Sequence, residues 1–231
     1  MGTKDDVESA VSKIFKGKWT TRNGTKVPDQ SDIGLGNDGV LIEGTILYAD
    51  LDGSTAMVDK FTKEFSAEIY KTYLDSTARI IRSESGDIVS FDGDRVMAVF
   101  IGDGKNTRAV RCGLKINYSV KHLVMPALTI QYPKTDFKIK HVVGIDTSSL
   151  LVARTGIRGS NDLVWVGPAA NYAAKLTELD SDFPTWITHR VFDNMRDEVK
   201  ETSGRAMWEA RRWTTMNNLS IYRSTWWWPV N

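Results

Sequence analysis

The alternation of apolar and polar residues along the chain predicts several strands that are interleaved with amphipathic helices. Residues 40–49 read VLIEGTILYA, which is typical of a strand. The period of two in a strand places Ile46, Tyr48 and Asp50 on the same face. A carboxylate is therefore expected near the end of this strand.

A second signal lies at residues 88–100, IVSFDGDRVMAVF, where two apolar runs flank the turn residues Asp92 and Gly93. An Asp-Gly pair between apolar runs predicts a β-hairpin. Asp94 follows the turn directly, so the hairpin carries a second carboxylate that a turn does not require. We interpret Asp92 as the turn former.

Helical periodicity is predicted in four segments: about 4–16, 54–82 with a break near Ser66, 106–122, and 168–179 after a proline. In the first of them, Val7, Val11, Ile14 and Phe15 share one face. We interpret residues 1–40 as an N-terminal helical arm.

Residues 137–156 alternate like a further pair of strands, residues 163–167 form a short apolar strand, and residues 185–195 begin as a strand and end as a helical turn. The order of the elements predicts an α+β sandwich in which helices cover one face of a mainly antiparallel sheet. Residues 201–231 are rich in tryptophan and are interpreted as an extension of the same domain, packed back onto it or across a dimer seam. An aromatic surface for a partner is the alternative.

Composition narrows the class of protein. Of 231 residues, 41% are apolar and 26% charged, as in a folded domain, and 30 basic residues nearly balance 29 acidic ones. No basic excess points to nucleic acid or to an anionic membrane, and we expect a cytoplasmic protein. The single cysteine, Cys112, excludes an internal disulfide, and the three histidines share no spacing typical of metal ligands.

Asp50 and Asp94 are 44 positions apart, and adjacent strands could bring them to one end of a sheet. Two neighbouring carboxylates repel each other unless a cation lies between them, and Mg²⁺ or Mn²⁺ shared with a triphosphate is a common solution. From these residues alone, both could equally cap turns.

Three motifs make the pattern specific. Residues 47–55 (LYADLDGST), 91–100 (FDGDRVMAVF) and 165–176 (WVGPAANYAAKL) resemble the catalytic domain of class III nucleotidyl cyclases, the adenylate and guanylate cyclase family. The resemblance covers roughly residues 41–190. It implies a ferredoxin-like cyclase sandwich, with residues 41–200 as the catalytic domain.

The resemblance also implies roles for individual residues. Asp50 and Asp94 would bind two Mn²⁺ or Mg²⁺ ions per active site, with the backbone carbonyl of Leu51 as a further ligand. The triphosphate would lie against the segment that follows, which comprises Asp52, Gly53, Ser54 and Thr55.

The helix after Gly167 carries Asn171 and Lys175 four residues apart, hence on one face. In the family the first orients the ribose, and the second, usually Arg, stabilises charge on the reacting phosphate. Lysine keeps the charge but lacks the planar fork of arginine. Because the family takes the metal ligands from one subunit and this pair from the other, a homodimer is implied. Arg211 and Arg212 are candidates to bind the triphosphate.

The positions that select a purine base in the family are Ser90 and Val164 here, so the usual adenine and guanine readers are missing. Tyr48 stands where the family commonly has Phe, and its hydroxyl narrows the base pocket. This pattern resembles the pyrimidine cyclases of Pycsar anti-phage systems, whose cyclic nucleotide activates a separate cyclic-nucleotide-binding effector. We expect UTP as the substrate. The alternatives are a cytidylate cyclase, an adenylate cyclase with an altered pocket, and an inactive nucleotide-binding module.

Overall fold

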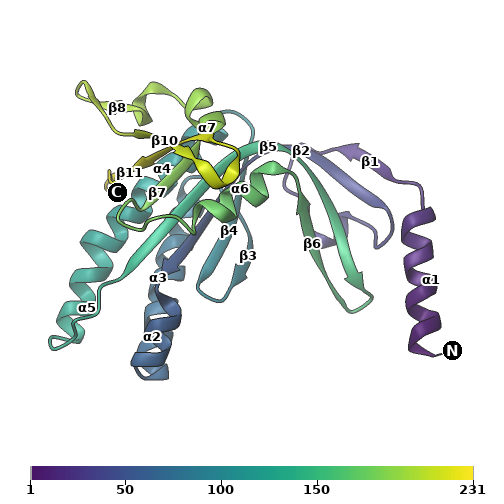
Figure 1. Ribbon diagram of the computed structural model, residues 1–231, viewed down its shortest axis with the longest axis horizontal. Helices are drawn as coiled ribbons and strands as arrows, with labels where there is room; N and C mark the ends of the chain where they lie inside the picture. Colours follow the sequence, from purple (N-terminus) through teal and green to yellow (C-terminus); the bar gives the residue numbers. More distant parts are fainter. Residues whose placement is uncertain (1, 231) are drawn as a thin grey trace.

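The computed structural model describes residues 2–230, which are organised around one nine-stranded sheet (Figure 1). Seven strands form its continuous path, in the order β10-β11-β7-β5-β2-β4-β3, while β1 pairs with β2 and β6 pairs with β5. The strands of this sheet are β1 (Thr20–Asn23), β2 (Asp38–Asp52), β3 (Asp87–Asp92), β4 (Arg95–Ile101), β5 (Lys140–Ile157), β6 (Ser160–Val166), β7 (Thr185–Thr188), β10 (Glu209–Trp213) and β11 (Leu219–Ser224). A separate small hairpin consists of β8 (Glu201–Thr202) and β9 (Arg205–Ala206).

All neighbouring strands of the large sheet are antiparallel except β1 with β2 and β5 with β7. The predicted α+β class with a mainly antiparallel sheet is therefore confirmed. No helix within residues 2–230 is both long and apolar enough to cross a membrane.

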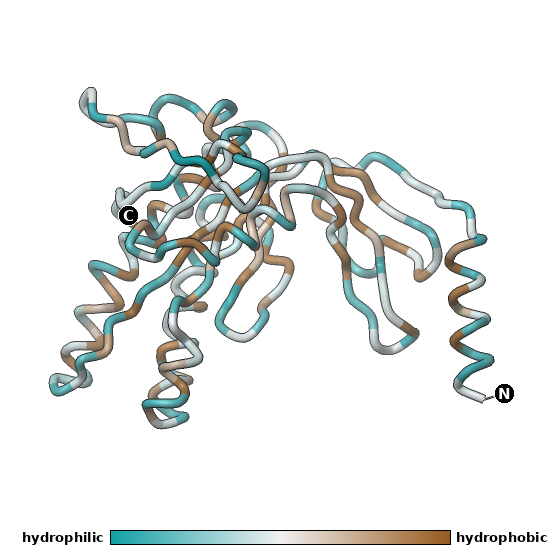
Figure 2. The backbone as a smooth tube through the Cα atoms, in the orientation of Figure 1, coloured by the Kyte–Doolittle hydropathy of each residue, from teal (hydrophilic) through white to brown (hydrophobic). Residues whose placement is uncertain are grey.

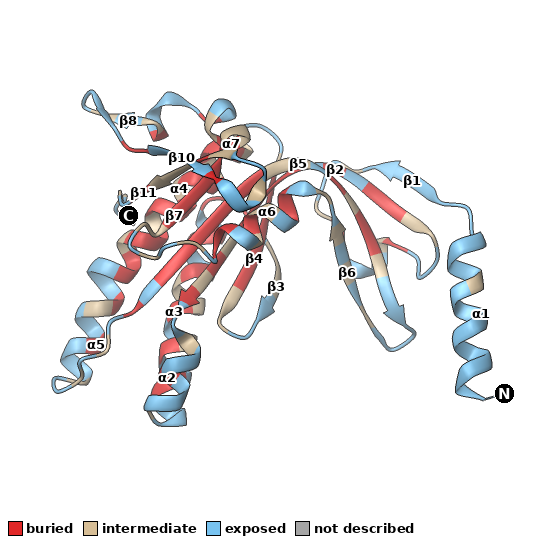
Figure 3. Cartoon of the chain, in the orientation of Figure 1, coloured by how far each residue is buried: buried red, intermediate tan, exposed pale blue. Residues whose placement is uncertain are grey.

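Helices pack on both faces of this sheet, not on one as predicted, because α6 lies on the face opposite α3 and α4. The helices of the chain are α1 (Thr3–Lys16), α2 (Ser54–Lys60), α3 (Lys63–Ser83), α4 (Lys105–Tyr118), α5 (Met125–Gln131), α6 (Pro168–Leu176) and α7 (His189–Asn194), with a π-helical turn at Ser119–Val124 and 3₁₀ turns at Gln30–Asp32, Asp197–Val199 and Thr214–Met216. The main core packs α3 and α4 against one face, where Leu47 and Phe100 are fully buried. On the other face α6 packs against Ile46 and Leu150. Buried residues follow β2, β5 and α4 through the centre of the molecule (Figure 3).

Three local predictions were wrong. The break in the second helix falls before Lys63, not near Ser66, because Thr62 caps α3 by accepting the Phe65 N–H at 3.2 Å. The next helix runs on to Gln131 instead of ending near His122. A π-helical turn widens it just before Pro126, which has no N–H to donate.

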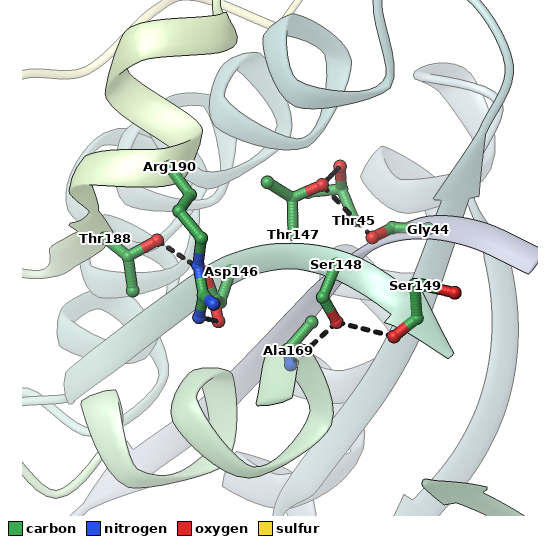
Figure 4. A network of polar contacts seen from close by, with 9 residues as sticks. All are labelled: Gly44, Thr45, Asp146, Thr147, Ser148, Ser149, Ala169, Thr188 and Arg190. Atoms are coloured by element: carbon green, nitrogen blue, oxygen red, sulfur yellow. Dashed lines mark hydrogen bonds and ion pairs between the residues drawn. The ribbon is translucent and has the colours of Figure 1, made fainter. Parts of the chain in front are cut away.

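The segment predicted as a pair of strands is the single strand β5, which pairs with β2 without interruption from Lys140 to Ala153. The polar residues in the middle of β5 do not form a turn, because the Thr147 hydroxyl forms hydrogen bonds within the sheet. Thr147 donates to the Gly44 carbonyl at 3.2 Å and accepts from Thr45 at 3.1 Å (Figure 4). The hairpin turn lies instead between β5 and β6.

The C-terminal segment is tied to the domain. Trp208 and Trp213 are buried, and Trp226 and Trp228 pack against the main core. Asn117 on α4 donates to the carbonyls of two residues of this segment, at 3.2 and 2.9 Å. At the opposite end of the molecule, α1 projects away from the sheet (Figure 1).

Candidate active site

The two candidate metal ligands lie close together at one end of the sheet. Asp50 stands near the end of β2, and Asp94 lies in the turn between β3 and β4. Because Ala49 pairs with Val96, the end of β2 lies beside this turn. Burial, followed by the charge of Asp94, raises the pKa of the Asp50 carboxyl to about 6. We call these two residues the carboxylate pair.

The carboxylate pair fits a cation. One carboxylate oxygen of Asp94 is buried and has no hydrogen-bond partner, and Asp50 is repelled by its neighbour. Both features would be relieved by a divalent ion. Within residues 2–230 no group of three or more Asp, Glu, His or Cys side chains could hold a metal alone. Backbone or substrate oxygens would therefore complete the coordination.

A row of three side chains crosses the sheet next to the carboxylate pair. Met97 on β4 pairs with Tyr48 on β2 and with Ser90 on β3, so the three share one face of the sheet. Tyr48 and Ser90 are each half-buried, and burial raises the pKa of Tyr48. We call these three residues the base row. The structure thus brings Tyr48 and Ser90 together with the carboxylate pair, and Asp50 extends the face of Tyr48 as the period of two predicted.

Val164 lies on β6, at a different part of the sheet from the base row. It pairs with Ala153 on β5, which in turn pairs with Gly39, nine residues before Tyr48 on β2. Its neighbours Leu163 and Trp165 pack inward, whereas Val164 is exposed. Within one subunit Val164 is therefore remote from the base row.

The segment after Asp50 turns sharply into α2. Gly53 adopts a left-handed conformation (φ 73°) that favours glycine, and Ser54 begins the helix. Leu51 is buried, Thr55 is exposed, and the Asp52 carboxylate accepts a hydrogen bond from the Ser181 hydroxyl at 2.6 Å. Asp52 thus anchors this turn to the loop before β7.

Asn171 and Lys175 lie on the exposed side of α6. The opposite side of this helix packs so closely on β5 that a Cβ at Gly144 would lie 2.2 Å from the Ala173 carbonyl oxygen. No hydrogen bond or ion pair between described residues joins Asn171 or Lys175 to the carboxylate pair. Lys175 instead contacts the Met216 sulfur at 3.9 Å. The contacts found within one subunit thus do not join Asn171 and Lys175 to the carboxylate pair.

Arg211 and Arg212 are on β10 at the edge of the sheet, with three strands between them and β2. Alternation places only Arg211 on the face that carries α6, because its pairing partner Ile221 packs on that side. Arg211 is paired with Glu209 at 2.7 Å, and Arg212 donates to Ser220 at 2.6 Å. Within one subunit neither arginine reaches the carboxylate pair.

Comparison with known proteins decides the family. No family model matches the chain. It is 53% identical to a uridylate cyclase of Xanthomonas perforans over 232 aligned residues, which cover 100% of both proteins. It is 50% identical to a uridylate cyclase of Burkholderia cepacia, again over 100% of both. The chain belongs to the uridylate cyclase family.

Solved structures of class III cyclases have the same fold as this uridylate cyclase family member. The adenylyl cyclase CyaB of P. aeruginosa matches it with a TM-score of 0.65 at 19% identity, over 80% of this chain and 94% of that one. The guanylyl cyclase Cya2 matches with a TM-score of 0.67 at 18% identity, over 80% and 93%. The cyclase fold and the nucleotidyl cyclase activity expected from the motifs are confirmed.

Sequence reasoning missed Arg95, which adjoins both parts of the site in this uridylate cyclase family member. Its guanidinium lies 5.3 Å from the centre of the Tyr48 ring and pairs with Asp92 at 3.2 Å. Arg95 also lowers the pKa of Asp50, against the larger effect of burial. The signal was available, because Arg95 precedes Met97 by two residues on a strand and thus shares its face.

Tyr73 supports the carboxylate pair from beneath. This residue of α3 is fully buried, and its hydroxyl donates to the Asp50 carbonyl at 3.4 Å. Burial and the charges of Asp50 and Asp94 raise its pKa well above the ordinary value, so the hydroxyl keeps its proton. Helical periodicity places Tyr73 inside, but nothing in the sequence shows which strand its hydroxyl meets.

A buried ion pair holds α6 in place. Asp146 on β5 is fully buried and accepts hydrogen bonds from Thr188 and from the Arg190 guanidinium (Figure 4). Arg190 also lies 5.2 Å from the centre of the Tyr172 ring on α6. At the start of α6, the Ala169 N–H donates to Ser148 at 3.1 Å. These contacts position the helix that carries Asn171.

Proposed function

We propose that this chain converts UTP to 3′,5′-cyclic UMP and pyrophosphate, in a homodimer with two shared active sites. The observation that carries the proposal is the base row beside the carboxylate pair, which has Ser90 at one of the purine-reading positions and Tyr48 where the family commonly has Phe. The relatives at 53% and 50% identity are named uridylate cyclases, which supports uracil as the base.

Two divalent ions, Mn²⁺ or Mg²⁺, would be held by Asp50 and Asp94, with the Leu51 carbonyl as a further ligand. The carboxylate pair fits this role because its repulsion and its unpartnered oxygen both call for positive charge. When bound, such ions neutralise the triphosphate and make the ribose 3′-hydroxyl easier to deprotonate. Tyr73 holds the Asp50 backbone in place beneath them.

The partner subunit would complete each site. Asn171 and Lys175 are exposed, and α6 turns them away from the β5 strand on which it packs. Asn171 of the partner subunit would orient the ribose, so that its 3′-oxygen attacks the α-phosphate in line with the departing pyrophosphate. Lys175 of the partner subunit would supply positive charge to the reacting phosphate.

The base would lie on the base row. Tyr48 narrows the pocket, Ser90 can donate to or accept from a pyrimidine edge, and Val164 of the partner subunit would close the pocket with an apolar side chain. Arg95 fixes the Tyr48 ring through their cation–π contact. Purine bases are larger than uracil, and in this pocket they would have neither enough space nor a matching hydrogen-bond partner.

The triphosphate would lie along residues 52–55 at the start of α2, because the first N–H groups of a helix have no acceptor within the helix and favour anions. Arg211 of the partner subunit is the better of the two arginine candidates, because it shares a face with α6. The product would act in the cytoplasm as a second messenger for anti-phage defence, through a separate cyclic-nucleotide-binding effector.

Incubation of the purified protein with Mn²⁺ and each of UTP, CTP, ATP and GTP, followed by chromatography of the products, tests this function. We expect cyclic UMP from UTP as the predominant product. Cyclic CMP as the predominant product would show that the substrate is CTP and not UTP. Cyclic AMP as the predominant product would contradict the assignment of a pyrimidine substrate. If no nucleotide gives a cyclic product, the remaining alternative is an inactive nucleotide-binding module.

A further inference from the structure

The N-terminal helix α1 has an apolar face that nothing in its own subunit covers. None of its 14 residues is buried. Val7, Val11, Ile14 and Phe15, which we call the apolar stripe, are exposed by 55%, 47%, 59% and 86%. None of them belongs to the packed clusters of the molecule. Figure 2 shows the apolar and polar residues alternating along the projecting helix.

The base of α1 is built to hold the helix at a fixed angle. The Asn37 side chain donates hydrogen bonds to the carbonyls of Ile14 and Gly17, both at 2.8 Å. A Cβ at Gly17 would lie 2.9 Å from the Lys13 carbonyl oxygen, so the chain turns there without room for a side chain. The helix is thus presented in a defined direction, as a docking element requires.

Such a helix needs a surface to pack on. Isolated helices of this length are marginal in water, and most helical stability in proteins comes from burying an apolar face. A stripe of four exposed apolar side chains on one helix therefore points to a partner surface that is absent from the single subunit.

The charge on α1 selects the kind of partner. Its three basic residues, Lys4, Lys13 and Lys16, are balanced by three acidic ones, Asp5, Asp6 and Glu8. A helix that binds an anionic membrane or nucleic acid carries a basic polar face, which α1 lacks. A neutral, protein-like surface fits it better.

A second copy of this chain is already required by the proposed shared site. The end of the molecule that carries α1 also carries β6 (Figure 1). Through its pairing with Ala153, Val164 of β6 lies far from the base row of its own subunit. This end of the sheet must therefore reach the partner subunit if Val164 is to close a base pocket. A two-fold axis would use the apolar stripe twice in one interface.

We propose that the apolar stripe of α1 packs against the partner subunit, so that each subunit clasps the other with its N-terminal arm. This inference rests on the proposed homodimer, not on the identity of the base. It makes α1 a determinant of the dimer affinity, and through that of activity, although α1 contributes no residue to the chemistry.

The test compares two double variants of the full chain by sedimentation, over protein concentrations from nanomolar to tens of micromolar. Val11→Gln with Ile14→Gln removes half of the stripe, and glutamine has a better helix propensity than either residue, so α1 itself is not weakened. Ser9→Gln with Lys16→Gln, on the opposite side of the helix, is the matched control.

We expect the stripe variant to raise the dimer dissociation constant at least about a hundredfold, and the control to change it less than about threefold. UTP turnover by the stripe variant should fall at low protein concentration and return at high concentration, as the dimer re-forms. A stripe variant that dimerises like the wild type, or a wild-type protein that stays monomeric, would overturn the proposal. Loss of dimer affinity in a protein that turns over no UTP at any concentration would support the docking and contradict the proposed function.

Discussion

Replacement of Asp50 by asparagine should abolish activity and at the same time stabilise the metal-free protein near neutral pH. In the folded protein the pKa of Asp50 is about 6, against an ordinary value of 3.8. A carboxyl whose pKa is raised by folding costs no stability well below pH 3.8, where it is protonated in both states, and its full cost is reached above pH 6. The free energy of unfolding therefore decreases as the pH rises from about 4 to about 6.

The difference between these pKa values corresponds to about 3 kcal/mol in the free energy of unfolding. Asp50 is only half-buried, so solvent screening reduces this figure to about 1 kcal/mol. In EDTA at pH 7.5, we expect Asp50→Asn to raise the melting temperature by about 2–4 °C, and to give a much smaller gain at pH 4, where the folded Asp50 carboxyl is protonated. Mn²⁺ should stabilise the wild type but not the variant.

Thermal melts of both proteins at the two pH values, with and without EDTA, check this expectation. Asp59→Asn, at an exposed position on the neighbouring helix α2, is the control for removal of a negative charge. Equal melting temperatures for wild type and Asp50→Asn at pH 7.5 in EDTA would refute the argument that the carboxylates of Asp50 and Asp94 repel each other in a partly desolvated site.

Three further outcomes follow from the same geometry. Asp94→Ala should eliminate cyclisation while leaving the circular dichroism spectrum unchanged, and near-normal turnover would remove it from the metal site. Tyr48→Ala should enlarge the base pocket and raise kcat/KM for ATP and GTP relative to UTP. An unchanged ratio would mean that Tyr48 does not select the base. Arg190→Met should destabilise the fold by about 3 kcal/mol, because it leaves the buried Asp146 charge unpaired. Adding Asp146→Asn should recover much of this loss in denaturant titrations, and a double variant no more stable than Arg190→Met would count against the ion pair.

The parts of the site that the sequence predicted depend on local patterns. The period of two along β2 places Tyr48 and Asp50 on one face, and the Asp-Gly turn creates the hairpin that presents Asp94. Both signals involve residues within a few positions of each other. The helical spacing of Asn171 and Lys175 is equally local.

The supporting residues could not be predicted because their contacts join distant parts of the chain. Tyr73 meets a strand 23 residues earlier, and Arg190 meets Asp146 44 residues earlier, and neither partner is marked by spacing or composition. The two arginines of β10 looked equivalent in the sequence, and only the pairing with β11 separates their faces. Long-range pairing of this kind depends on the register of the whole sheet.

The central claim is that the active site is shared between two subunits and uses Asp94 from one and Asn171 from the other. It is tested most directly by mixing the inactive Asp94→Ala and Asn171→Ala proteins and measuring cyclic UMP formation from UTP and Mn²⁺, after subunit exchange has been verified with differently tagged chains. Random exchange makes half of the dimers mixed, each with one intact site, so we expect recovery of up to about a quarter of the wild-type activity. No recovery in a mixture with demonstrated exchange would contradict the shared site.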